Sequence, residues 1–327
     1  MMQASDTPFE QLHQLDLSRI PKGESRYFWL HIINNGIGAP IKVPIIVARG
    51  AKDGPVLGLT AAIHGNELNG IPVLQQLFRE VDPRQLRGTL VGGLVMNVPG
   101  LLLQQRKFDD GFDLNRIAPG QAEGQVSEVY IYRIVEQVLQ HFDFLIDLHT
   151  ASRGRINSWY IRADMSTAPT ARMARLQNPD IILHNPPNDG TFRGAAADLG
   201  IHAITLELRD PHVFQSGVIE DALQGLRHVL YDLDMLEGPK IDPQPTILCD
   251  DSYWIYTDEG GILEVLPDIR QKVDTGAPIA IIRDVFGQKV KTLEAPEPGI
   301  VIGKSVSPVN QTGSRILHLG LSPKRVG

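Results

Sequence analysis

The sequence has almost no cysteine, no long hydrophobic run and no excess of positive charge. Its 327 residues include one cysteine, Cys249, which cannot form an internal disulfide bond. The first residues, MMQASDTPFEQ, lack the charged and then apolar pattern of a signal peptide, and no apolar stretch is long enough for a transmembrane helix. These absences predict a cytoplasmic protein that does not cross a membrane.

Lysine and arginine together number 31, against 38 aspartates and glutamates, which gives a formal net charge of −7. Sequence-independent binding of nucleic acid needs concentrated positive charge, so we expect no nucleic-acid partner. No G-x-S-x-G motif occurs, and no nucleotide-binding glycine pattern follows a predicted strand, so we expect no nucleotide cofactor. The sequence does not indicate an oligomeric state, and a homo-oligomer stays open.

The hydrophobic content of 42% is enough to fill a sizeable core. In the first two thirds of the chain, segments of strand type alternate with segments of helix type. Strands are predicted at residues 27–33, 41–48, 56–63, 89–97, 142–149 and 201–209, and helices at residues 70–81 and 127–142. This alternation predicts an α/β fold with a mostly parallel or mixed central sheet.

The pattern changes near residues 237–251, EGPKIDPQPTILCDD, where three prolines and several acidic residues interrupt it. We interpret this stretch as a linker. Beyond it, short strands separated by Gly, Pro and Asp turns show no helical period, which indicates a small all-β domain. The sequence therefore predicts an α/β domain at residues 1–240 and an all-β domain at residues 241–327.

Polar residues stand where three predicted strands end. His64 follows one strand, His149 ends the next, and Glu207 lies at the end of a third. In an open α/β sheet the ligand crevice lies outside the carboxyl ends of the strands. Glu67 follows His64 in HGNE, and Gly65 would permit a tight turn between them.

Zinc in hydrolases is typically held by three His or carboxylate ligands, with water in the fourth position. His64, Glu67 and His149 supply such a set, so the sequence predicts one zinc ion per chain. Hydrolysis also needs a carboxylate near the metal but not bound to it, and Glu207 is the candidate.

Negative charge that develops on an attacked carbonyl needs a fixed cation, and a substrate carboxylate is best held by a guanidinium. The long polar loop between residues 97 and 127 carries Arg106 and the segment DLNR. Loops of this length are usually functional or disordered. Arg106 and Arg116, with Asn115 beside it, are therefore candidates for these two tasks.

HGNE, DLNR with an upstream arginine, DLHT and ITLEL resemble the motifs of the succinylglutamate desuccinylase/aspartoacylase family, which is related to the zinc carboxypeptidases. The resemblance covers roughly residues 40–230. It implies a zinc-carboxypeptidase-like mixed central sheet with flanking helices. It also implies a zinc-dependent deacylase that hydrolyses the amide bond of a small N-acyl amino acid.

The same resemblance implies a role for each residue of the motifs. His64, Glu67 and His149 would bind zinc, Glu207 would be the general base, and Arg106 would polarise the scissile carbonyl. Asn115 and Arg116 would bind the substrate carboxylate, and Arg193 in GTFRGAAADLG is a further candidate for the substrate pocket.

The C-terminal segment has a resemblance of its own, to the barrel-sandwich hybrid fold of biotinyl and lipoyl domains. Those domains carry a modified lysine at the tip of a hairpin, where this chain has APEPG at residues 295–299. We therefore expect the fold to be shared without the carrier function.

Two alternatives stay open. The segment LRD after Glu207 is closer to zinc carboxypeptidases and supports a metallo-carboxypeptidase that acts on peptides, although Asn66 stands where those enzymes commonly have an arginine. The other alternative is a metal-free binding module on the same fold. The sequence does not identify the acyl group or the amino acid of a substrate.

Overall fold

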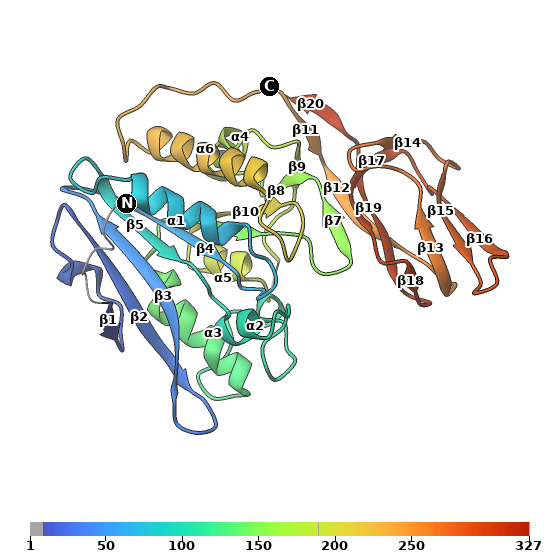
Figure 1. Ribbon diagram of the computed structural model, residues 1–327. Coiled ribbons are helices and arrows are strands. Elements are labelled where there is room, and N and C mark those ends of the chain that lie inside the picture. The colour runs from blue at the N-terminus through green and yellow to red at the C-terminus, as the bar shows by residue number, and fades with distance from the viewer. Residues whose placement is uncertain (1–8, 189, 327) are drawn as a thin grey trace.

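The computed structural model describes residues 9–188 and 190–326 (Figure 1). A mixed sheet of eleven strands runs through the larger part of the molecule, in the order β1-β2-β3-β5-β4-β6-β10-β8-β9-β11-β20. Its strands are β1 (Glu10–Leu12), β2 (Glu24–Asn34), β3 (Pro40–Arg49), β4 (Lys52–Ala61), β5 (Arg87–Gly93), β6 (Phe144–His149), β8 (Trp159–Ala163), β9 (Ile181–His184), β10 (His202–Leu208), β11 (Thr246–Cys249) and β20 (Lys324–Val326).

Helices cover both faces of this sheet and enclose two hydrophobic cores. One core lies under α1 (Gly70–Glu80), α4 (Ala168–Leu176) and α6 (Ser216–Asp232), and the other lies under α3 (Val126–Gln137) and α5 (Phe192–Asp198). The four strands β5, β4, β6 and β10 in the middle of the sheet are parallel, and antiparallel strands flank them. The predicted α/β fold with a mixed central sheet is confirmed. In the part of the chain that the structure describes, no helix combines the length and the hydrophobicity needed to cross a bilayer.

The predicted helix at residues 70–81 shows why the sequence folds in this way. Its buried residues Val73, Leu74, Leu77 and Phe78 recur at intervals of three and four, so they lie on one side of α1 and pack into the first core. The strands β4 and β6 beside it carry apolar runs at residues 54–59 and 144–146, as expected for parallel strands covered on both faces.

Several predicted boundaries are wrong by a few residues; for example, the strand predicted at residues 89–97 ends at Gly93, and another such error has a clear local cause. The strand predicted to end at residue 63 ends at Ala61, because Ala62 has φ of 52° and turns the chain out of the sheet. Asn97 holds this turn, since its backbone N–H donates to Ala62 O and its side-chain amide donates to Ile63 O. The helix predicted to reach residue 142 stops at Gln137 and a short 3-10 turn follows.

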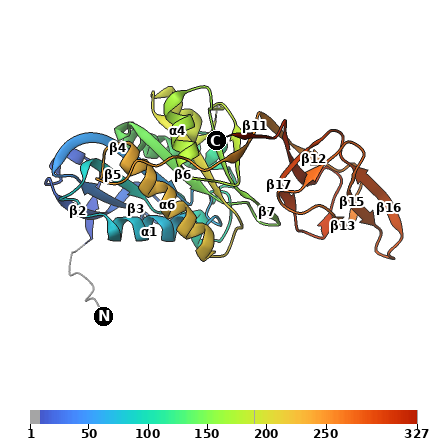
Figure 2. The ribbon, with the colours of Figure 1, turned by 90° about the horizontal axis from the view of Figure 1, so that it is seen from above.

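The C-terminal region contains two further sheets, with a third hydrophobic core that takes residues from both. One sheet has the order β12-β19-β17-β14 and the other has the order β16-β15-β13-β18. Their strands are β12 (Asp251–Tyr256), β13 (Gly261–Val265), β14 (Lys272–Val273), β15 (Pro278–Arg283), β16 (Lys289–Glu294), β17 (Gly299–Ser305), β18 (Val309–Asn310) and β19 (Arg315–Leu321). Figure 2 shows these sheets as a lobe that projects from one end of the large sheet.

The two regions exchange strands across the predicted boundary at residue 240. β11 and β20 follow that boundary in the sequence, yet they form the edge of the large sheet. In return, β7 (Arg155–Asn157) leaves the first region and pairs with β17 of the C-terminal sheet. The predicted linker therefore ends before β11, and Cys249, which we placed in it, is buried in that strand. The division into two folding domains stays a prediction.

A small fourth core joins the two regions where the strands are exchanged. Tyr160 of β8 and residues of β9 and β11 pack there against Ile300 and Ile302 of β17. Apolar contacts therefore connect the large sheet to the C-terminal sheet at the same place as the exchanged strands.

We predict that the substitution Ile302→Ala will destabilise both regions. Ile302 is fully buried in the joining core, and loss of such a side chain typically costs about 2–5 kcal/mol of unfolding free energy. Amide hydrogen exchange measured by mass spectrometry should then accelerate in β8 and β9 as well as in β17. The matched control is Val285→Ala. Val285 is 81% exposed, so this substitution should change neither the unfolding free energy nor the exchange rates. Unchanged exchange in β8 and β9 in the Ile302 variant would contradict the prediction.

Candidate active site

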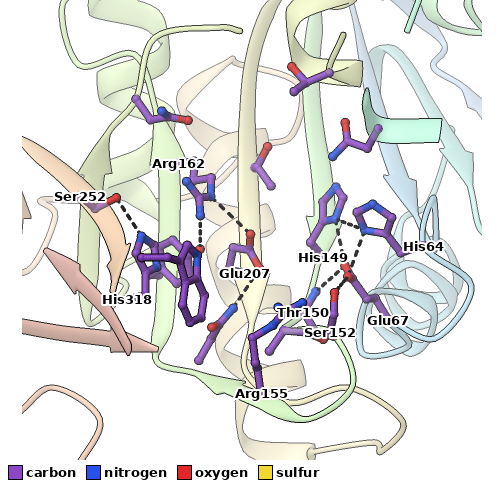
Figure 3. Close-up of a pocket in the computed structure, with 18 of the residues that line it drawn as sticks. His64, Glu67, His149, Thr150, Ser152, Arg155, Arg162, Glu207, Ser252 and His318 are labelled. Atoms are coloured by element: carbon purple, nitrogen blue, oxygen red, sulfur yellow. Dashed lines mark hydrogen bonds and ion pairs between the residues drawn. The ribbon is translucent and has the colours of Figure 1, made fainter. Parts of the chain in front are cut away.

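The residues predicted to carry the chemistry lie around one cavity at the carboxyl ends of β4, β6 and β10. The cavity has a volume of about 550 Å³, and its walls include His64, Glu67, His149, Glu207 and Arg106. The strand register brings two of these residues together directly, because Glu207 of β10 pairs with His149 of the neighbouring parallel strand β6. Figure 3 shows Glu207 between the two histidines on one side and Arg162 on the other.

The three predicted metal ligands converge at one buried point. Oxygen atoms of Glu67 lie 3.0 Å from Nδ1 of His64 and 3.0 Å from Nδ1 of His149, and the two Nδ1 atoms lie 3.2 Å apart. All three side chains are almost fully buried. Among the residues that the structure describes, this is the group of ligand atoms close enough together to hold a metal ion.

A carboxylate stands behind each of the two imidazole rings. Nε2 of His149 lies 2.6 Å from Asp147, and Nε2 of His64 lies 3.0 Å from Asp113. Because an ionised carboxylate only accepts hydrogen bonds, Nε2 of each ring donates to its carboxylate, and Nδ1 of each ring faces the point of convergence. Thr60, paired with Asp147 across β4 and β6, donates to the other oxygen of Asp147.

This arrangement fits a metal site of the zinc type. Histidine ligands of zinc usually donate their second N–H to a carboxylate, which fixes the ring and makes it a better ligand. Two imidazole nitrogens and one carboxylate form the three-ligand set of hydrolytic zinc sites. The Nδ1 atoms of His64 and His149 face each other at short distance, and a metal ion between them would be bound by both once these atoms are deprotonated.

The charges of the site are strongly coupled. Burial disfavours the ionised form of Glu67, but His64, His149 and Arg106 outweigh burial and hold the pKa of this carboxyl well below its usual value. Burial also disfavours the charged form of His149, but Asp147 and Glu67 outweigh it and hold the pKa of His149 well above the usual value. The carboxylate of Glu67 is therefore ionised and available as a ligand over the ordinary pH range.

The loop from His64 to Glu67 is fixed by close packing rather than by an unusual turn. We predicted that Gly65 would be needed for its backbone freedom, but its φ is not positive. A Cβ atom at this position would instead lie 1.9 Å from the backbone of Gly100, in α2 (Val98–Leu102). Gly65 is required because α2 approaches the loop too closely for any side chain.

Glu207 lies beside the predicted metal ligands and is bonded to other residues. Its carboxylate accepts a hydrogen bond from Asn157 at 3.2 Å and lies 3.4 Å from Nε of Arg162. Its side chain is 13% exposed, and it lines the cavity. Glu67 is thus held by the two histidines, whereas Glu207 remains accessible to a molecule in the cavity.

Arg106 reaches from the long loop to the predicted metal ligands. Its Nη1 lies 2.9 Å from Glu67, its Nε lies 2.9 Å from Asp113, and it also bonds to Ser152. Its guanidinium is therefore fixed next to the point where the predicted metal ligands meet. This is where a cation could stabilise negative charge on a carbonyl oxygen.

The three predicted substrate-binding residues also line the cavity. Asn115 accepts a hydrogen bond from the backbone N–H of Phe192, and Arg116 donates to Asn115 O. Arg193 is 5% exposed and bonds to Asn185 through uncharged oxygens, and burial lowers the pKa of its guanidinium to about 10. Neither Arg116 nor Arg193 forms an ion pair within residues 9–188 and 190–326.

Sequence reasoning missed two groups of residues at this site. Asp147 and Asp113 could have been recognised, because Asp147 precedes His149 by two positions on one face of a strand and Asp113 begins the DLNR motif. The second group comes from the C-terminal sheets and forms one wall of the cavity. It could not have been found without the strand pairing of the two regions. Its members are Asp251, Ser252, Tyr253, Trp254, Arg315 and His318.

Residues 53–233 match the succinylglutamate desuccinylase/aspartoacylase catalytic domain. Among curated proteins, the chain is 23% identical over 267 residues to N-alpha-acetyl-L-2,4-diaminobutyric acid deacetylase of Halomonas elongata, which is 78% of each chain. It is 33% identical over 174 residues to succinylglutamate desuccinylase of Pseudomonas paraeruginosa. That match covers 49% of this chain and 52% of the other, so the chain spans about half the length of the desuccinylase.

Solved structures share the fold over nearly the whole chain. The product-bound ectoine utilization protein EutE (DoeB) of Ruegeria pomeroyi has a TM-score of 0.84 and 21% identity, and covers 93% of this chain and 98% of its own. A succinylglutamate desuccinylase/aspartoacylase of Rhodobacter sphaeroides has a TM-score of 0.82 and 19% identity, and covers 96% of this chain and 98% of its own. The arrangement of the α/β region and the C-terminal sheets is therefore that of known proteins.

We predict that His64→Ala and His149→Ala will each lose bound zinc while the fold is largely kept. Each variant removes one of three converging ligands, but the packed cores on both faces of the sheet stay in place. Metal content by atomic emission and circular dichroism of the purified variants check this. His31→Ala, a substitution on the strand β2 far along the sheet order, is the control. Full zinc content in both ligand variants would refute the ligand assignment.

We further predict that Asp147→Asn will weaken zinc binding without abolishing it. The substitution keeps the shape of the side chain but removes the charge behind His149, and loss of such a partner typically lowers metal affinity about 10–100-fold. Competition with a chromogenic chelator measures the affinity. Asp268→Asn, at a 91% exposed position of the C-terminal region, should bind zinc as the unaltered protein does. Equal affinity in both variants would show that Asp147 does not support the ligand.

Proposed function

The chain belongs to the succinylglutamate desuccinylase/aspartoacylase family, and we propose on that premise that it is a zinc-dependent deacylase. Its substrate is a small N-acyl amino acid, and the bond hydrolysed is the amide bond between the acyl group and the amino nitrogen. The names of two relatives, a deacetylase and a desuccinylase, support removal of an acyl group as the reaction.

One observation carries this proposal. The cavity brings together a three-ligand set, a separate carboxylate on the adjacent strand and a fixed guanidinium beside the ligands. Amide hydrolysis needs these three elements together: a Lewis acid, a group that moves protons, and a cation for the oxyanion.

His64, Glu67 and His149 would hold the zinc ion, which supplies Lewis acidity toward the amide carbonyl and lowers the pKa of a water molecule. Glu207 takes the proton that the attacking water loses and passes it to the leaving amino nitrogen. Its position suits this task because its carboxylate faces the cavity and is held from behind by Asn157 and Arg162. Without that proton the nitrogen would leave as an unstable anion.

Arg106 stabilises the oxyanion that forms on the attacked carbonyl. Its contacts with Glu67 and Asp113 fix the guanidinium before substrate binds, so no reorganisation is needed during the reaction. Asn115 and Arg116 hold the substrate carboxylate, and Arg193 is placed to contribute to the same pocket. These contacts orient the amide bond toward Glu207.

The carboxypeptidase alternative has no support from the cavity. The residues that favoured it, Arg209 and Asp210, lie outside the cavity wall, and Asp210 bonds to Gln215 instead. Arg209 has φ of 58°, so the chain turns away from the sheet directly after β10.

A screen of acetyl, formyl and succinyl amino acids against the zinc-loaded protein tests the proposed function. We expect release of free amino acid from at least one of these classes, measured by amine detection. A panel of dipeptides and tripeptides in the same assay tests the carboxypeptidase alternative. Protein that binds no zinc and hydrolyses nothing would favour the binding module and overturn our proposal.

We predict that Glu207→Gln will keep zinc and substrate binding but lose turnover. Glutamine preserves the shape of the side chain and cannot accept the proton, a step that typically contributes about 10²–10⁴-fold to the rate. We therefore expect kcat to fall by at least this factor, while zinc content and the Kd for substrate change little.

Glu264→Gln is the matched control, because Glu264 is exposed on β13 of the C-terminal region. It should retain full activity. A Glu207→Gln variant that turned over substrate at the rate of the control would require another residue as the base.

A further inference from the structure

The cavity holds more positive charge than the reaction itself requires. Six arginines line it, and two of them are paired with carboxylates: Arg106 with Glu67 and Asp113, and Arg162 with Glu207. The remaining four form no ion pair within the described parts of the chain. They are Arg116, Arg155, Arg193 and Arg315. Arg116 and Arg193 belong to the pocket already proposed for the substrate carboxylate.

Arg155 and Arg315 form a second group on the wall made by the C-terminal sheet. Arg155 begins β7 and Arg315 begins β19, and both strands pair with β17. The guanidinium carbons of Arg155 and Arg315 lie 5.5 Å and 5.8 Å from the ring centre of Trp254 on β12. The five-stranded C-terminal sheet therefore presents both cations beside one indole ring.

The indole of Trp254 is held in place from within the wall. It stacks on the ring of His318 with centroids 5.0 Å apart and an interplanar angle of 12°. His318 is 2% exposed and bonds to Ser252 through Nε2. A fixed aromatic ring limits the movement of the two arginines that lie against it.

Most N–H groups of these two guanidinium groups form no hydrogen bond within the described residues. Within the described residues, the side chain of Arg155 makes no hydrogen bond, and that of Arg315 makes one, from Nε to Tyr256. Asp251 also lines the cavity, but its carboxylate accepts a hydrogen bond from the backbone N–H of Ser252, and it forms no ion pair with either arginine in the described parts of the chain. The N–H groups of Arg155 and Arg315 are thus available to donate hydrogen bonds to a ligand.

The charges around Arg155 and Arg315 also favour binding of an anion. Burial lowers the pKa of the Arg155 guanidinium, and the nearby charges of Arg315 and Arg106 lower it further. Like charges that face one cavity destabilise each other until an anion binds between or beside them. A carboxylate is the anion whose geometry matches the two N–H groups of a guanidinium.

We propose that Arg155 and Arg315 form an outer anion subsite that binds a second carboxylate of the substrate, remote from the amide bond. This inference rests on the proposed function and makes it more specific. The substrate then carries at least two carboxylates, one held by Arg116 and its neighbours and one held at the C-terminal wall. The second carboxylate comes either from a dicarboxylic acyl group or from an acidic side chain of the amino acid.

Two pairs of compounds that differ by one charge distinguish these sources. N-acetylglutamate and N-acetylglutamine differ in the side chain, whereas N-succinylglutamine and N-succinamoylglutamine differ in the acyl group. For one pair, we expect the zinc-loaded protein to prefer the acid over the amide by about 10-fold or more in kcat/KM, as for a hydrogen-bonded charged group. The pair in which the acid is preferred identifies the part of the substrate that reaches the subsite.

Arg155→Gln and Arg315→Gln should each reduce this preference toward unity, because they lower kcat/KM for the acid more than for the amide compound. Arg153→Gln is the matched control, because Arg153 is exposed, lies two residues from Arg155 and does not line the cavity. It should keep the full preference. The same pairs are compared by titration calorimetry, which measures binding without turnover.

The outcomes separate this inference from the proposed function. Turnover without a preference for the acid in either pair overturns the subsite and leaves the deacylase function standing. Absence of turnover overturns the function. In that case, tighter binding of an acid that both arginine variants abolish still supports the subsite, and equal affinities refute it. A preference that survives in both variants also refutes it.

Discussion

The site depends on the register of three parallel strands. β4, β6 and β10 pair so that Thr60 stands beside Asp147 and His149 stands beside Glu207. Adjacent strands lie about 4.8 Å apart, so these pairs bring the predicted ligand His149, its supporting carboxylate Asp147 and the candidate base Glu207 within reach of one another. If the pairing of two strands shifted by one residue, one residue of each pair would point to the opposite face of the sheet. The apolar residues between these polar ones, which fill both cores, are what hold the register.

The chain leaves this sheet through strained backbone at two functional points. Ala62 after β4 and Arg209 after β10 both have positive φ, which is unfavourable for residues other than glycine. At the first exit, hydrogen bonds from Asn97 and the close approach of α2 at Gly65 hold the loop that carries His64 and Glu67. At Ala62, the strained residue thus lies where the chain changes direction abruptly and brings His64 to the cavity.

Sequence reasoning reached the inner part of the site because local patterns encode it. His64, Glu67, His149 and Glu207 stand at the ends of apolar runs, and the direction of parallel strands then places them at one edge of the sheet. The outer wall is different, because its position depends on pairing between segments far apart in the chain. Ser305 and Gly154, which bond at this junction, are 151 residues apart. No local pattern in the sequence predicts that Trp254 and Arg315 line the same cavity as His149.

The same long-range pairing explains why the predicted linker at residues 237–251 wrongly included β11. Proline content and a change of period correctly indicated where helices cease, but β11 looks like any other short strand in the C-terminal region. Its neighbours, β9 on one side and β20 on the other, come from distant parts of the sequence. Strand partners are decided by the packing of Tyr160, Cys249 and Ile302 in the joining core, which only the folded chain displays.

The exchange of β7 also limits how the cavity can open. Only the residues 150–154 connect β6, which ends at His149, to β7 in the C-terminal sheet. Both ends of this short tether are fixed by strand pairing, and Ser152 in its middle bonds to Glu67 and Arg106. Five residues span at most about 18 Å when fully extended, so the tether has little slack. A rigid-body swing of the C-terminal sheet away from the cavity would therefore pull on Ser152, and through it on the predicted metal ligand Glu67 and on Arg106.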